Sequence, residues 1–204
     1  MRFGLPVRIL AAAAFLVLAL VGVVLREDLA RAKGQEVRLE LAGYDPRSLL
    51  QGHYVQFRLS HSFPPGTRCP AGADGITLDP KGWVALKREG DHHAPAGAAK
   101  TRAEAQRLGD VVARGTLTCL GSFTTTSRPG LPDVHTPEVL NVSLDLGVDR
   151  IHLDQATAEA VQREMMRQPR GQPAGYAVLS IGRDGKARVK GLIVGARRVD
   201  LDWF

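Results

Sequence analysis

An uninterrupted apolar run near the start of the chain constrains the protein more than any other feature. Residues Ile9–Leu25 are 17 consecutive positions without a charged or strongly polar side chain. A bilayer core of ~30 Å needs about 20 helical residues. The run reaches that length when it is extended back to Leu5 across Arg8, whose long side chain can reach the membrane interface. The sequence therefore predicts a transmembrane helix that contacts the lipid bilayer through residues 5–25.

A cleaved signal peptide is the competing interpretation of this run. The apolar core of a signal peptide is usually about 7–15 residues long, and an Ala-x-Ala pattern does occur at Ala30–Ala32. Three charged residues at positions 26–28 separate that pattern from the apolar run, so we favour an uncleaved anchor. We accordingly expect an anchor over residues 1–30 and a β-rich domain over residues 31–204.

The orientation of the anchor does not follow from charge, because basic residues on its two sides nearly balance. A short N-terminal tail before a long globular part fits a domain on the extracytoplasmic side. Cys69 and Cys119 agree with this, since they could pair in an oxidising compartment. A disulfide would close a loop of about 50 residues and add about 3–4 kcal/mol in the chain-entropy model. Two unpaired, buried cysteines are the alternative.

The rest of the chain predicts a mainly β (α+β) domain. Alternating apolar and polar residues mark half-buried strands, and Asp184-Gly185 between two such runs marks a hairpin. One soluble helix is expected over Gln155–Gln168, with Asp154 as its cap. Loops are expected over residues 63–82 and 121–137, and a polar insertion over 89–109. The expected strands are 35–41, 54–59, 83–87, 111–119, 139–146, 175–181 and 187–194. About seven short strands favour a small antiparallel β-barrel or sandwich with one packed helix.

The segment between the first two strands holds the candidate site residues. An Asp-Pro pair starts a turn, and Gly52 permits backbone conformations closed to other residues before the next strand begins. We interpret the segment as structural, with aromatic rings buried and polar side chains satisfying the turn. The alternative is a binding surface at the rim of the domain, formed by His53, Tyr54 and Arg58. The candidate residues are Asp45, Arg47, Gly52, His53, Tyr54, Phe57 and Arg58.

No pattern of catalytic, metal-ligating or cofactor-binding residues is evident. The six histidines show no His-x-x-x-His spacing, no Cys-x-x-Cys is present, and we therefore expect solvated loop histidines, no metal and no cofactor. They are His53, His61, His92, His93, His135 and His152. An aromatic content of 5% and the absence of a basic block argue against a nucleic-acid partner.

Residues 45–59 resemble the hallmark of the GDYXXLXY family, which comprises membrane-anchored bacterial proteins of unknown function. Gly52 and Tyr54 fall on the Gly and first Tyr of that motif, whereas His53, Phe57 and Leu59 replace its Asp, Leu and last Tyr. Two further segments are similar to the family, Gly147–Leu153 ahead of a helix and Asp184–Leu192 in the closing hairpin. The resemblance implies a membrane span and an extracytoplasmic β-rich domain, and it supplies no reaction.

We expect a non-enzymatic module on the periplasmic side of the bacterial cytoplasmic membrane. Its predicted partner is another envelope protein or an integral membrane protein, and its role is binding or assembly. The alternative is a membrane-anchored hydrolase with an unrecognised site. The segment is loosely similar to the start of signal-peptidase-like proteases, in which the nucleophilic serine precedes the proline by three residues; that position is Gly43 here.

Overall fold

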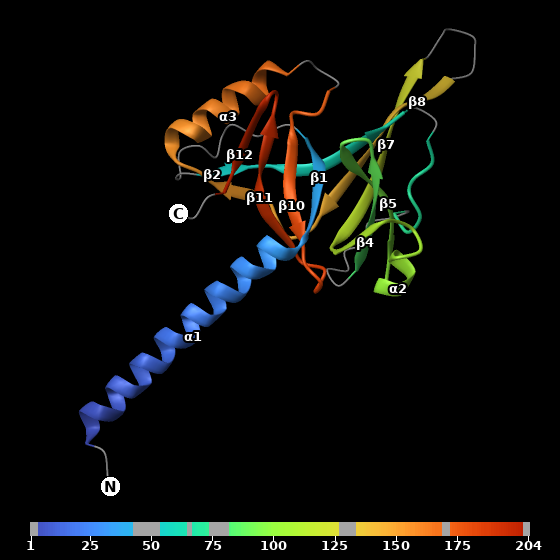
Figure 1. Ribbon diagram of the computed structural model, residues 1–204. Helices are drawn as coiled ribbons and strands as arrows, with labels where there is room; N and C mark the ends of the chain where they lie inside the picture. Colours follow the sequence, from blue (N-terminus) through green and yellow to red (C-terminus); the bar gives the residue numbers. More distant parts are fainter. Residues whose placement is uncertain are drawn as a thin grey trace.

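A computed structural model of the protein consists of a β-rich domain and one long helix that projects from it (Figure 1). The structure describes residues 4–42, 54–64, 67–73, 82–126, 134–168 and 172–201. The predicted site residues Asp45, Arg47, Gly52 and His53, and the position of Gly43, lie outside these ranges.

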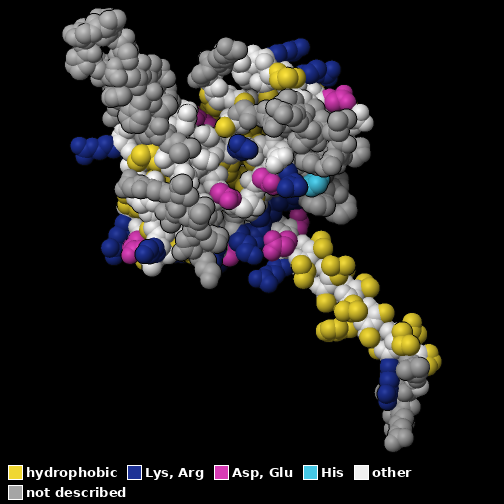
Figure 2. Space-filling model, turned by 180° about the vertical axis from the view of Figure 1, so that it is seen from behind, with side chains coloured by type: hydrophobic (Ala, Val, Ile, Leu, Met, Phe, Trp, Pro, Cys, Tyr) yellow, Lys and Arg dark blue, Asp and Glu magenta, His cyan; other side chains and the backbone are white. Residues whose placement is uncertain are grey.

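Helix α1 (Leu5–Lys33) contains the predicted membrane-spanning run. Its segment Pro6–Lys33 is long and apolar enough to cross a membrane, and none of its most apolar stretch is buried in the protein. A signal sequence near an N-terminus can have the same length and apolar composition. Apolar side chains cover the projecting part of the helix, and charged side chains gather where it meets the domain (Figure 2). The helix ends at Gly34, and the first strand begins at once.

Seven strands form the main antiparallel sheet, in the order β12-β11-β10-β1-β3-β8-β7. Strand β1 therefore lies at the centre, where it pairs with β10 over Gln35–Glu40 and with β3 over Leu41–Ala42. Alternation places the apolar side chains Val37, Leu39 and Leu41 in the core, as the sequence predicts. The strands are β1 (Gln35–Ala42), β3 (Arg58–Phe63), β7 (Thr116–Thr126), β8 (Val134–Asp145), β10 (Tyr176–Ile181), β11 (Ala187–Val194) and β12 (Arg197–Asp200).

Two smaller sheets and two short helices complete the described part of the domain. Strand β4 pairs with β5 on one side and β6 on the other, and β2 pairs with β9. Asp154 accepts a hydrogen bond from the Thr157 backbone at 3.0 Å, so it caps the C-terminal helix as predicted. The remaining elements are β2 (Tyr54–Gln56), β4 (Trp83–Glu89), β5 (His92–Ala99), β6 (Val111–Arg114), β9 (Arg150–His152), α2 (Arg102–Ala105) and α3 (Gln155–Arg167).

The sheets share one hydrophobic core. Buried residues of the seven-stranded sheet pack with Val84 and Leu86 of β4, with Val55 and Ile151 of the small β2-β9 sheet, and with Val161 of α3. The domain is mostly antiparallel β with few helices, as predicted. The described strands form no closed barrel, because β12 and β7 are the two edges of the main sheet.

Four sequence predictions need correction. The expected strand 111–119 is divided at Gly115 into β6, which pairs with β4, and β7, which pairs with β8. The expected strand 54–59 is divided at Phe57 into β2 and β3, which pair with different partners. The expected polar insertion contains strand β5 and the short helix α2. The expected loop 121–137 is partly strand, since β7 and β8 extend into it and pair with each other. For the insertion and the loop, pairing with a neighbouring strand overrides weak local propensity.

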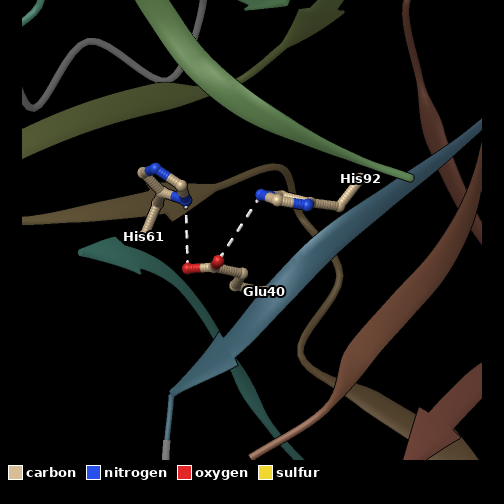
Figure 3. A group of neighbouring side chains, drawn as sticks. All are labelled: Glu40, His61 and His92. Carbon is tan, nitrogen blue, oxygen red and sulfur yellow. Dashed lines mark ion pairs between the residues drawn. The ribbon is translucent and has the colours of Figure 1, made fainter. Parts of the chain in front are cut away.

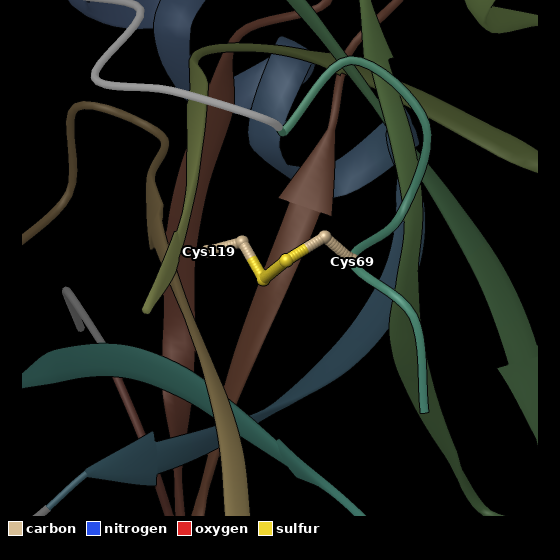
Figure 4. Close-up of a disulfide and its surroundings, with 2 residues drawn as sticks. All are labelled: Cys69 and Cys119. Carbon is tan, nitrogen blue, oxygen red and sulfur yellow. A yellow bond between two sulfur atoms is a disulfide. The ribbon is translucent and has the colours of Figure 1, made fainter. Parts of the chain in front are cut away.

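Cys69 and Cys119 form a disulfide, so the bonded alternative is the one that the structure contains (Figure 4). The bridge joins the segment after β3 to strand β7 across 50 residues of sequence. It ties the Pro- and Gly-rich connection to the main sheet.

Candidate functional site: a glutamate between two histidines

Glu40, His61 and His92 bring their side chains together where the main sheet meets the three-stranded sheet. They come from β1, β3 and β5 respectively. One ligand atom from each of the three lies within 4.8 Å of the others. Both imidazole rings face the carboxylate, one at each oxygen (Figure 3).

The local fold explains how the glutamate reaches this position. Strands β1 and β3 pair only through Leu41 and Ala42 of β1, and Glu40 is the next residue, where that pairing has ended. Its carboxylate lies beside β3, and the nearby Ser62 backbone helps to lower its pKa. His61 continues the buried face of β3, two residues after Leu59. The sequence analysis missed this site, and a histidine in line with core residues was the signal that could have pointed to it.

The contacts in the cluster are short. Nδ1 of His61 lies 3.0 Å from Oε2 of Glu40, and Nε2 of His92 lies 3.6 Å from Oε1. The His61 side chain is 9% exposed, the Glu40 side chain 14% and the His92 side chain 20%. The His61 contact does not have hydrogen-bond geometry, so Nδ1 of this buried ring has no hydrogen-bond partner among the described residues.

Electrostatics favour a charged carboxylate at the centre. Burial raises the pKa of Glu40, but the neighbouring His61 and His92 imidazoles and the Ser62 backbone outweigh this effect, and the pKa lies below its ordinary value. The Tyr176 ring packs against His92, with ring centroids 5.5 Å apart. Burial, followed by the charges of Glu40 and Asp91, raises the pKa of the Tyr176 hydroxyl. The site therefore contains a partly buried anion.

Asp91 orients the His92 ring. Its Oδ1 lies 3.2 Å from Nδ1 of His92, and this contact is the first cause of the lowered pKa of Asp91. An ionised carboxylate can only accept a hydrogen bond, so Nδ1 is the protonated nitrogen that donates to it. Nε2 of His92 is then directed to Glu40. The sequence prediction of solvated loop histidines is wrong for His61, which is buried, and for His92 and His93, which lie on strand β5 and are half-buried.

The candidate residues of the motif segment are not gathered into this cluster. Phe57 is buried, and its backbone N–H donates to Asp149 O at 2.8 Å. Arg58 follows it and is exposed, while the backbone of Tyr54 pairs with that of His152 in the β2-β9 sheet. The binding surface expected from His53, Tyr54 and Arg58 stays a prediction, because His53 and the Tyr54 side chain lie outside the described residues.

The β2-β9 sheet joins two segments that are far apart in sequence. Val55 pairs with Ile151 and Gln56 with Arg150, so residues 54–57 lie beside residues 149–152. Helix α3 follows β9 directly and packs on β2. Strand β2, strand β9 and the start of α3 are thereby fixed together.

The fold defines a class of protein in which a domain of antiparallel sheets is carried behind one long apolar N-terminal helix. Within that class, the chain belongs to the GDYXXLXY family: the family model, described as GDYXXLXY protein, matches residues 16–192. The match includes most of the apolar helix and nearly all of the domain. No curated protein and no solved structure matches the chain. The function of this family is not known, so the chemistry has to be argued from the residues.

Proposed function

We propose that the protein is an uncleaved, single-pass membrane protein of the bacterial envelope. Its β-rich domain lies on the periplasmic side and binds another envelope or integral membrane protein without catalysing a reaction. This proposal rests mainly on the junction between α1 and the domain, where residues at the end of the helix contact strands β10 and β11.

Ionic contacts fasten the end of α1 to the hairpin of β10 and β11. Nε of Arg188 on β11 donates to Oε2 of Glu27 on α1 at 2.7 Å, and the same guanidinium contacts Asp184 at 3.0 Å. The Arg188 side chain is only 11% exposed. This ion pair can stabilise the protein only if the helix stays attached. Cleavage near Ala30–Ala32 would remove Glu27 and leave Arg188 without that partner.

Packing at Gly34 supports the same conclusion. A Cβ atom at this position would lie 2.0 Å from Oγ of Ser180 and 3.0 Å from the carbonyl oxygen of Ile181, both on β10. The helix therefore enters the domain in direct contact with the main sheet. A domain held in this way presents a defined face to the membrane, which suits recognition of a membrane-embedded partner.

The disulfide supports the location of the domain. Cys69 and Cys119 are bonded, and such bonds persist in oxidising compartments such as the bacterial periplasm and are rare in the cytoplasm. A domain with an oxidised cysteine pair thus fits the periplasmic side of the membrane.

The test is a fractionation and co-purification experiment on the full chain with a C-terminal tag. We expect the protein in the membrane fraction with an intact N-terminus by mass spectrometry, and a reproducible partner after cross-linking in cells and extraction in mild detergent. The matched control replaces residues 1–30 with a cleavable signal peptide, which releases the domain and loses the partner. A mature chain that starts near Lys33 would overturn the anchor, and recovery of the protein alone under every condition would overturn partner binding.

A further inference from the structure

We propose that Glu40, His61 and His92 form a binding site for a divalent transition-metal ion, and that Zn²⁺ suits this ligand set best. The ligand atoms are a carboxylate oxygen of Glu40, Nδ1 of His61 and Nε2 of His92. This site is independent of the partner-binding role proposed above.

The donor set is one that transition metals bind. Two imidazole nitrogens and one carboxylate are the protein ligands of many zinc sites that keep a fourth position for water. Magnesium and calcium prefer sites made of oxygen ligands, so the two imidazoles select against them. The Glu40–His61–His92 site thus favours ions of the zinc type.

The distances are close to those that a bound ion requires. Zinc–ligand bonds of about 2.0–2.1 Å in tetrahedral geometry place neighbouring ligand atoms about 3.3 Å apart. The two histidine–glutamate contacts, each to a different oxygen of the carboxylate, are 3.0 and 3.6 Å, and one ligand atom from each residue lies within 4.8 Å of the others. The ligand atoms would have to draw together by up to about 1.5 Å to reach the tetrahedral spacing around an ion.

The orientation of His92 is that of a metal ligand. Its Nδ1–H is donated to Asp91, which leaves a lone pair on Nε2 directed to Oε1 of Glu40 at 3.6 Å. A lone pair that faces an anionic oxygen needs a proton or a cation between them. A carboxylate that holds the second nitrogen of a liganding histidine is a recurring arrangement around bound zinc.

The charge and hydrogen bonding of the Glu40–His61–His92 site also favour a bound cation. The ion-pair partners of the Glu40 carboxylate among the described residues are the two histidines, with no lysine or arginine. Nδ1 of His61 is buried without a hydrogen-bond partner in the same part of the structure. One divalent cation would satisfy this nitrogen and neutralise the carboxylate, and both are costly to leave unpaired in a protein interior.

A bound ion would join the two larger sheets, because Glu40 and His61 belong to the main sheet and His92 to the three-stranded one. The one-fifth exposure of His92 provides a route of entry. The competing explanation is a protonated His92 or His61 that pairs with Glu40 and binds no metal.

The experiment measures Zn²⁺ affinity of the full chain in detergent, by competition with a chromophoric chelator at neutral pH. We expect one equivalent to bind, with affinity at least tenfold weaker in each of His61→Gln, His92→Gln and Glu40→Gln. The matched control is His93→Gln, the neighbouring histidine, whose Nδ1 accepts from the Arg38 backbone instead. Asp91→Asn is expected to weaken binding about tenfold, because it loosens the orientation of His92.

X-ray absorption at the zinc edge of the wild-type protein provides a readout that does not depend on the folding of any variant. We expect two imidazole nitrogens at about 2.0–2.1 Å and one or two oxygens. The proposal is overturned if wild-type protein binds no Zn²⁺, if a six-oxygen shell is found, or if His93→Gln weakens binding as much as His92→Gln does.

Discussion

Trp83 at the start of β4 lies against the turn between β10 and β11, and a single glycine makes room for it. Gly185 has φ of +79°, and a Cβ atom there would lie 2.4 Å from Cζ3 of Trp83. The guanidinium groups of Arg102 and Arg114 lie over the indole ring, at 5.5 and 4.8 Å from its centroid. These two cation–π contacts fix the ring, so it cannot move away without losing them.

We predict that Gly185→Ala lowers the free energy of unfolding by about 2–3 kcal/mol. About 1–2 kcal/mol comes from the left-handed backbone conformation and the rest from the contact with Trp83. Gly90→Ala is the matched control, because Gly90 has φ of +61° and no atom within 4 Å of the added Cβ. Urea unfolding followed by circular dichroism measures both. Equal losses in the two variants would contradict the steric part of the prediction.

The Asp184 carboxylate in the same turn makes the stability of the domain depend on pH. The hydrogen bond from Arg188 holds the pKa of Asp184 at about 2, below its ordinary value of 3.8. Because the folded pKa is the lower one, the stabilisation is complete above about pH 4 and is lost as the pH falls towards 2.

We predict that Asp184→Asn removes this part of the acid sensitivity. Asp184 is 42% exposed, so screening by solvent limits the effect to about 1 kcal/mol or less. Thermal unfolding midpoints between pH 2 and pH 5 measure it. Parallel profiles for the variant and the wild-type protein would show that Asp184 does not contribute.

At the scale of single residues, the sequence alone predicts core positions and a helix cap, but it does not predict the Glu40–His61–His92 site. The alternation of Val37, Leu39 and Leu41 and the capping role of Asp154 follow from local rules and are confirmed. The Glu40–His61–His92 site could not be found in this way, because its residues lie on three strands whose pairing is not encoded locally. Only His61, on the buried face of β3, carried a local signal.

At the scale of elements, strands with a strong local pattern were predictable and strands defined by their partners were not. The β10-β11 hairpin is present as the Asp-Gly turn predicts. Strands β9 and β12 were missed, since each is short and exists through pairing with β2 and β11 respectively. Strand β5 contains Ala, Pro and Gly, residues with low strand propensity, and is held by pairing with β4.

The disulfide between Cys69, in the segment after β3, and Cys119 on β7 leads to a prediction about stability. We expect the double variant Cys69→Ser, Cys119→Ser to lose about 3–4 kcal/mol, because the bridge restricts the unfolded chain by closing a long loop. Urea unfolding under non-reducing conditions measures the loss. The wild-type protein under reducing conditions is the control and should match the variant. An unchanged unfolding midpoint would mean that residual structure in the unfolded chain already restricts this loop.

At the scale of the whole molecule, the helix and the domain form one continuous unit. The sequence predicted both parts, and it placed their boundary at residue 30. The structure continues α1 to Lys33 and passes directly into β1. The contacts of Glu27 and Gly34 with β10 and β11 could not be predicted, because they depend on how the hairpin folds back beside the helix.

We predict that Gly34→Ala destabilises the domain by about 1–2 kcal/mol, because the added methyl group meets β10 and either the serine or the backbone has to shift. Gly22→Ala is the control within α1, since a Cβ there meets nothing within 4 Å. Thermal unfolding in detergent compares the two. A loss of stability in Gly22→Ala as large as that in Gly34→Ala would place the cause in the detergent-covered helix instead.

The central place of β1 in the main sheet has a mechanical consequence. The chain leaves α1 and enters the fourth of seven strands, which is hydrogen-bonded to β10 along six residues and to β3 along two. A pulling force transmitted along the helix would load these hydrogen bonds in shear, all at once. A tether attached to an edge strand would instead peel its bonds apart one after another. Attachment to this central strand therefore resists tension better than attachment to an edge strand would.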